Sequence, residues 1–183
     1  MNIVVMGTGG VGGYFGAKLA NAGNNVCFIA RGKHLEAIKD NGLKIISETG
    51  DILIHPANAT DNPEELEIAD IILFCVKAYD TEASAKLIKP IVGPKTAVIP
   101  FLNGLGHIEI MKNILGNNNV IGGVAAISAL IEEPGIIRHN SPMQMLKFGE
   151  FSNEKTERVI EFQSACEKAG INNACLLYTS PSP

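Results

Sequence analysis

Apolar and polar positions divide this chain into segments that predict strands separated by helices. An apolar run at residues 2–6 precedes a glycine-rich stretch, and apolar residues then recur at helical spacing up to residue 22. A second apolar run follows at residues 26–30. A strand, a glycine turn, an amphipathic helix and a second strand in this order are typical of a dinucleotide-binding unit.

The same alternation continues through the rest of the chain. Residues 43–47 and 52–55 predict a hairpin around Gly50-Asp51, because Gly and Asp favour tight turns between apolar runs. Elsewhere the pattern predicts strands at 71–76, 97–101, 120–126, 136–139 and 143–148, and helices at 33–41, 81–88, 108–115 and 153–169, the last capped by Ser152 or Asn153. Strands that alternate with helices predict an α/β protein with a Rossmann-type, doubly wound, mostly parallel sheet.

The glycine-rich turn has the residue types that a pyrophosphate site requires. It reads Gly7-Thr8-Gly9-Gly10-Val11-Gly12. The first glycine of such a motif permits the turn, the second lets the backbone approach the pyrophosphate, and the third lets the helix pack on the sheet. The free N–H groups of the helix N-terminus then meet the phosphates. The alternative is a tight turn that binds nothing.

Arg31 follows the second predicted strand, where the residue type selects the cofactor. An NAD site has a carboxylate there, which accepts a hydrogen bond from the ribose 2′-hydroxyl. This chain has Arg31-Gly32-Lys33 instead, with no neighbouring carboxylate to repel a phosphate. A guanidinium can bind a 2′-phosphate through paired hydrogen bonds. The sequence therefore predicts NADP(H) rather than NAD(H), the alternative being a solvated basic turn.

Composition excludes several classes of function. The 183 residues are 46% hydrophobic and 19% charged, with a formal net charge of −4, which predicts a packed core and no nucleic-acid partner. No signal peptide or membrane-spanning run is recognisable, so no membrane partner is expected. The four cysteines form no CxxC pair, which favours a reducing, cytoplasmic location and no metal site.

Two polar residues lie where predicted parallel strands end. Lys77 directly follows residues 71–76, and Asn103 follows residues 97–101. Ligands of doubly wound sheets bind at the carboxyl ends of the strands. We therefore expect Lys77 to meet a phosphate or a ribose hydroxyl, and Asn103 to hold the nicotinamide ribose or a substrate oxygen. The alternatives are a surface lysine and an ordinary Asn-Gly turn.

Taken together, five stretches resemble the ketopantoate reductase (2-dehydropantoate 2-reductase) family as far as about Asn173: residues 7–16, Arg31, residues 75–79, residues 103–106 and residues 122–124. In that family NADPH reduces ketopantoate, a 2-oxo acid, to pantoate on the route to pantothenate and coenzyme A. The resemblance implies that the glycine turn binds the pyrophosphate and that Arg31 binds the 2′-phosphate. It also implies that Lys77 and Asn103 line the nicotinamide end, that Asn103 reaches the substrate, and that the backbone of Ala129 contacts the cofactor.

The resemblance also implies a missing part. Family members continue into a helical second domain that supplies the catalytic Lys, and residues 175–183, with two prolines and two serines, do not match its first helix. We expect residues 1–170 to form the NADP-binding domain. Residues 171–183 would be a truncated start of the second domain with a non-native tail, similar to translated sequencing-adapter sequence.

Three functions remain open at this point. The first is ketopantoate reduction, for which this fragment would bind NADP(H) but contain no catalytic residue and have little activity alone; the full-length enzyme would form a homodimer. The second is reduction of a related 2-oxo acid. The third is a non-catalytic module that senses NADP.

Overall fold

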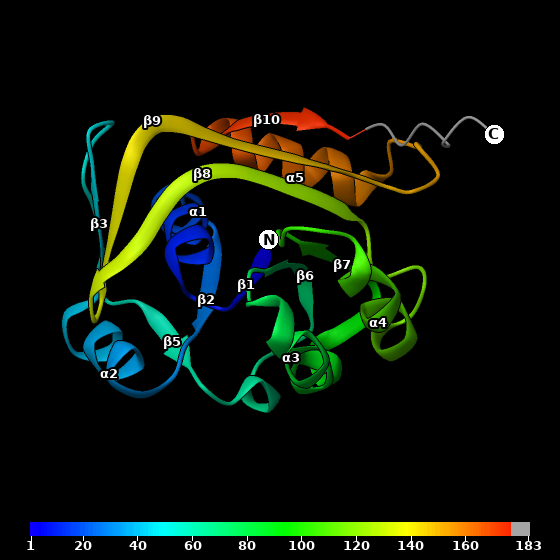
Figure 1. Cartoon of the computed structure of the whole chain (residues 1–183), viewed down its shortest axis with the longest axis horizontal. Helices are drawn as coiled ribbons and strands as arrows, with labels where there is room; N and C mark the ends of the chain where they lie inside the picture. The colour runs from blue at the N-terminus through cyan, green and yellow to red at the C-terminus, as the bar shows by residue number, and fades with distance from the viewer. Residues whose placement is uncertain (177–183) are drawn as a thin grey trace.

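The computed structural model describes residues 1–176, and a parallel five-stranded sheet lies at its centre (Figure 1). Its strands are β1 (Asn2–Met6), β2 (Asn25–Ile29), β5 (Asn58–Thr60), β6 (Ala69–Phe74) and β7 (Val92–Pro100). They lie in the order β5-β2-β1-β6-β7, and every neighbouring pair is parallel. The prediction of a Rossmann-type, doubly wound sheet is confirmed.

The two faces of this sheet belong to separate apolar cores, because successive side chains of a strand point to opposite faces. Ile3 and Val5 of β1 lie in one core, whereas Val4 and Met6 lie in the other. Helices α1 (Gly10–Asn21) and α5 (Glu157–Lys168) cover the first face, and α3 (Thr81–Ile88) and α4 (Gly106–Leu115) cover the second. Helices on both faces explain why the central strands are almost wholly apolar.

A second sheet lies beyond α1 and was not predicted as a separate unit. It contains β3 (Leu43–Ser47), β4 (Ile52–Ile54), β8 (Gly122–Glu133), β9 (Ile136–Gly149) and β10 (Asn172–Cys175). The long strands β8 and β9 arch over α1, which therefore lies between the two sheets (Figure 1). Buried Tyr14, Phe15 and Leu19 all lie on α1, so this helix is enclosed on more than the single face that its spacing predicted.

Two short elements agree closely with the sequence. The predicted hairpin is formed by β3 and β4, which pair antiparallel. Helix α2 (Gly32–Asn41) ends at Gly42, whose φ of 82° lies in the left-handed region. The predicted strand at residues 120–126 begins with a bridge from Val120 to Val98 of the central sheet, but it then leaves that sheet as β8.

The two strands predicted at 136–139 and 143–148 are one strand, β9, so the division into two was wrong. Strand β8 pairs with both halves, and the register shifts between Ile127, which lies opposite Gln144, and Ala129, which lies opposite His139. The extra residues of β9 form a bulge that contains Pro142. Proline favours a bulge over a regular ladder position because it has no N–H to donate.

The prediction for the last helix was correct in type but placed its start too early. Helix α5 begins at Glu157 after Thr156, and neither Ser152 nor Asn153 caps it. Asn153 has a φ of 63°, which interrupts a helix. The intervening turn brings the Thr156 hydroxyl within 2.7 Å of the Glu150 carboxylate, which also accepts a hydrogen bond from Arg158 Nε at 2.8 Å.

The chain end contributes to the second sheet, since β10 pairs in parallel with β9 over residues 172–175. The domain boundary at residue 170 stays a prediction, and most of the tail expected to be non-native, residues 177–183, lies outside the described residues. Within residues 1–176, no helix combines the length and apolar character needed to cross a membrane.

Candidate functional site

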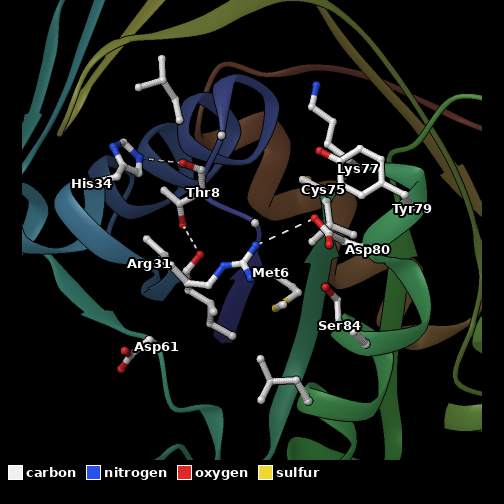
Figure 2. Close-up of a pocket in the computed structure, with 18 residues that line it drawn as sticks. Met6, Thr8, Arg31, His34, Asp61, Cys75, Lys77, Tyr79, Asp80 and Ser84 are labelled. Carbon is white, nitrogen blue, oxygen red and sulfur yellow. Dashed lines mark hydrogen bonds and ion pairs between the residues drawn. The ribbon is translucent and has the colours of Figure 1, made fainter.

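A cavity of about 590 Å³ opens at the carboxyl ends of β1, β2 and β6 (Figure 2). The chain leaves β1 and β6 in opposite directions across the sheet, so this is the switch point at which doubly wound sheets bind ligands. Residues from all three strand ends, from α3 and from β8 line the cavity, among them Met6, Gly7, Thr8, Gly9, Ala30, Arg31, His34, Asp61, Cys75, Lys77, Tyr79, Asp80, Ser84 and Ile131.

The glycines of the turn differ in what surrounds them. Gly7 has a φ of 93°, a conformation that side chains strongly disfavour. A Cβ on Gly12 would collide with the Gly7 carbonyl oxygen and lie 2.8 Å from Val5 Cγ1, so α1 packs directly against β1 at this point. A Cβ on Gly9, in contrast, would meet no described atom within 4 Å. Gly9 therefore faces open space on the cavity side, which fits a backbone that a ligand approaches.

Thr8 anchors the turn with all of its polar groups. Its backbone N–H and its hydroxyl both donate to the Ile29 carbonyl, at 3.1 and 2.9 Å, which ties the turn to the end of β2. Its own carbonyl lies 2.7 Å from His34 Nε2 (Figure 2). The side chain is buried. Thr8 thus shapes the cavity wall, with its N–H and its hydroxyl both donated to Ile29, and its predicted contact with a cofactor stays a prediction.

His34 connects three parts of the molecule. The backbone N–H of Gly135, in the turn between β8 and β9, donates to its Nδ1 at 2.9 Å. Nε2 therefore carries the proton and donates to Thr8. Burial lowers the pKa of His34, and the hydrogen bond to Thr8 raises it by a smaller amount. The neutral ring is the form that can accept from Gly135 and donate to Thr8 at the same time.

The N-terminus of α1 supplies the expected amides. Gly13 N–H donates to the Gly9 carbonyl at 2.8 Å, which is the first bond of the helical ladder. The N–H groups of Gly10, Val11 and Gly12 precede that bond and have no partner within the helix. Within residues 1–176, no side chain caps this terminus. Such a terminus offers hydrogen-bond donors and a partial positive charge to an anion.

Arg31 lies at the cavity mouth with a carboxylate beside it, which corrects the expectation that none was near. Its Nη2 is 3.9 Å from Asp80 Oδ2 (Figure 2). Asp80 follows β6, almost fifty residues further along the chain, and only the neighbouring positions of β1, β2 and β6 in the sheet bring the two together. The mouth therefore carries both charges, not the purely basic patch that the sequence predicted.

Lys77 and Cys75 reach the cavity from the end of β6. Lys77 is exposed and precedes a 3₁₀ turn, η2 (Ala78–Asp80). Burial raises the pKa of the Cys75 thiol to about 12. This thiol is therefore protonated at neutral pH and is a poor nucleophile.

Other predicted residues lie outside the lining of this cavity. Asn103 is exposed in the loop after β7, and β7 neighbours β6, so that loop lies at the same edge of the sheet. Ala129 lies on β8 over the start of α1, where a Cβ on Gly10 would be 2.5 Å from its carbonyl carbon. Gly10, Val11 and Gly12, at the start of α1, are likewise not part of the cavity lining. The binding roles of all these residues stay predictions.

Sequence reasoning missed His34, Asp61 and Asp80 as lining residues. Asp80 had a usable signal, because it stands in the segment directly after a buried parallel strand. His34 had none, since its partners Thr8 and Gly135 are distant in sequence. Within the described part of the chain, no cluster of three or more His, Cys, Asp or Glu side chains is placed to hold a metal ion.

Comparison with known proteins is consistent with this geometry. Residues 3–153 match the family model described as ketopantoate reductase PanE/ApbA. An uncharacterized oxidoreductase, YkpB of Bacillus subtilis, is 34% identical over 165 residues, which are 90% of this chain and 54% of that protein. A 2-dehydropantoate 2-reductase of Mesorhizobium japonicum is 33% identical over 192 residues, covering 93% of this chain and 58% of that protein.

Solved structures show the same relationship. The crystal structure of 2-dehydropantoate 2-reductase from Porphyromonas gingivalis superposes with a TM-score of 0.89 and 38% identity, over 96% of this chain and 64% of that one. The chain thus spans little more than half the length of the two curated relatives that it matches. On the family match over most of its length, this chain belongs to the ketopantoate reductase PanE/ApbA family.

Proposed function

We propose that this chain binds NADP(H) in the cavity at the carboxyl ends of β1, β2 and β6, as the nucleotide-binding part of a reductase that converts 2-dehydropantoate to pantoate. One observation carries the cofactor part of the proposal. The uncapped N-terminus of α1 directly follows Gly9, which faces open space, and Arg31 lies at the mouth of the cavity that Gly9 lines. The substrate part rests on the family.

The residues fit a dinucleotide in the following way. The N–H groups of Gly10, Val11 and Gly12 would receive the pyrophosphate, and Arg31 would bind the 2′-phosphate. Lys77 would contact a phosphate or a ribose hydroxyl. Asn103 would hold the nicotinamide end and the substrate oxygen, and the Ala129 backbone would close over the turn. The bound cofactor supplies a hydride, while these residues bind and orient it.

No general acid is assigned among the described residues. Reduction of a ketone requires a proton donor at the carbonyl oxygen, and Lys77 is committed to the cofactor side. We therefore expect binding of NADPH with little or no turnover of 2-dehydropantoate by this chain alone. The whole protein's preference for 2-dehydropantoate over another 2-oxo acid, its homodimer and its cytoplasmic location stay predictions.

The test is a fluorescence titration of the folded chain with NADPH and NADH, for the native chain and two charge variants. Arg31→Asp is expected to weaken NADPH binding about tenfold or more, because a charge-assisted paired hydrogen bond is lost. NADH binding should change much less. Lys33→Asp makes the same charge change at an exposed neighbour outside the cavity lining and serves as the control.

Three outcomes would each contradict a part of the proposal. Absence of saturable binding of either cofactor by the folded chain would overturn the cofactor site. Equal losses of NADPH and NADH binding in Arg31→Asp would overturn the role of Arg31. Rapid NADPH oxidation in the presence of 2-dehydropantoate would overturn the prediction of low activity. A pure NADP sensor is favoured if the uninterrupted gene encodes no second domain.

A further inference from the structure

Asp80 occupies a common position for an aspartate, but its side chain does not make the contact that is usual there. It is the residue before α3, where an aspartate commonly accepts hydrogen bonds from the first helical N–H groups. Its side chain makes no such bond. Its carboxylate faces Arg31 instead, at 3.9 Å, from the opposite side of the cavity mouth (Figure 2).

The backbone around Asp80 is well anchored. Its N–H donates to the Lys77 carbonyl at 2.9 Å, which closes the η2 turn. Thr81, the next residue, is buried against the fold. The Asp80 side chain is 35% exposed, whereas that of Arg31 is 82% exposed. The carboxylate is thus the more constrained partner, and the guanidinium is the one that can turn between partners.

We infer that Asp80 is a specificity-determining residue that competes with the cofactor 2′-phosphate for Arg31 and so reduces the preference for NADP(H) over NAD(H). This inference rests on the proposed function. Arg31 can direct its paired N–H groups to a carboxylate or to a phosphate. A phosphate bound by Arg31 would also stand near the negative charge of Asp80. NAD(H) has a hydroxyl in place of this phosphate and avoids both effects.

The competition predicts a modest effect. The pair is partly exposed, and exposed ion pairs are weak. Asp80→Asn keeps the side-chain shape and removes the charge, so we expect it to tighten NADPH binding by about fivefold. NADH binding should stay the same or weaken slightly. Raising the salt concentration should shrink the difference between the native chain and the variant, because salt screens exposed charges.

Asp61→Asn is the matched control. Asp61 lines the same cavity, and it forms no ion pair with Arg31 in the described part of the chain. It therefore reports the effect of removing one negative charge from the cavity without freeing the guanidinium. Asp80→Ser gives a second uncharged variant that retains a good residue for the start of α3. In an Arg31→Ala background, Asp80→Asn should improve NADPH binding clearly less than it does in the native background, because only the direct repulsion between Asp80 and the phosphate is then relieved.

The outcomes separate this inference from the proposed function. If Asp80→Asn changes NADPH and NADH binding equally, or if Asp61→Asn has the same effect, the inference is wrong while the cofactor site stands. A gain of the same size in the Arg31→Ala background would also overturn it, because the competition for Arg31 would then contribute nothing. If the folded native chain binds neither cofactor, the proposed function itself fails, and the inference fails with it.

Discussion

Two parts of the cavity wall differ in composition, because one is formed by backbone and the other by charged side chains. On the β1 side the wall is backbone, with the glycine turn packed against β1 and β6 and held by buried Thr8 and by His34. At the ends of β2 and β6, which flank β1, the wall carries charged side chains, with Arg31 opposite Asp80. A side chain added at Gly12 in the turn must disturb the packing, whereas a substitution at Arg31 or Asp80 changes charge with little cost in packing. Binding strength and cofactor choice are therefore separable in this molecule.

The largest expected effect contrasts two glycines of the same turn. Gly12→Ala should lower the free energy of unfolding by about 2–3 kcal/mol, because the new methyl group has no room between the Gly7 carbonyl and Val5. Gly9→Ala should change it by less than about 1 kcal/mol, since no described atom lies within 4 Å of the added Cβ. Urea unfolding of both variants measures the difference.

The Gly9 variant should also test where the cofactor approaches the turn. Gly9→Ala is expected to remain folded and to weaken NADPH and NADH binding together by about tenfold or more, because the methyl group occupies the approach to the pyrophosphate. Normal binding by Gly9→Ala would show that the ligand does not approach there. Equal stability of the two variants would show that the close packing at Gly12 is relieved by a shift of α1.

A smaller loss is expected at His34. His34→Leu removes the hydrogen bonds to Thr8 and Gly135 while keeping a side chain of similar size. We expect a loss of about 1–2 kcal/mol in the free energy of unfolding. Cofactor binding should also weaken, because the glycine turn loses one of its anchors. Urea unfolding and NADPH titration measure both effects, and His55→Leu, at an exposed histidine, is the control.

The smallest expected effect is a pH dependence of stability through the same histidine. Burial holds the pKa of His34 below its ordinary value of 6.5 in the folded state. His34 of the unfolded chain therefore binds a proton at a higher pH than His34 of the folded chain. The free energy of unfolding falls as the pH drops below about 6.5, and it stops falling once the pH is below the lowered pKa of the folded state. Above 6.5 the full stability is present. Urea unfolding between pH 7.5 and pH 5 measures this slope.

His34→Leu should make that slope shallower without removing it. The pKa of His107 is also lowered by burial, so this second histidine contributes in the same direction. His107→Leu is the companion variant, and the double variant should have the shallowest slope of the series between pH 7.5 and pH 5. A slope that His34→Leu leaves unchanged would show that His34 has the same pKa in the folded and the unfolded chain.

Much of the central sheet and of the glycine turn was predictable because their causes are local. The spacing of Gly7, Gly9 and Gly12 after an apolar strand identified the turn, and the structure shows three different environments at these positions. Helix α3 has the predicted bounds for the same reason, since its apolar positions recur at helical spacing. The bulge within β9 was predicted only as a break between two strands. A proline indicates that a strand is interrupted but does not indicate whether the same strand continues after it.

The second sheet and the charge pairing were not predictable from local patterns. Enclosure of α1 on two sides follows from the pairing of β9 with β3, which are about ninety residues apart. The hydrogen bond of His34 to Gly135 depends on the same arrangement. Asp80 was visible as a strand-end residue, but nothing in the sequence indicated that its carboxylate would turn away from its own helix and toward Arg31.

The sequence by itself therefore determined β1, β2 and β6, the glycine turn and the basic residue after β2, because each depends on residues within a few positions of one another. It predicted no strand at β5 or β10. Only the tertiary structure decided which distant groups meet at the cavity: His34 with Thr8, and Asp80 with Arg31. The physical reason is that hydrogen bonds and ion pairs act over a few ångströms of space, and the folding of the sheets sets which parts of the chain come that close.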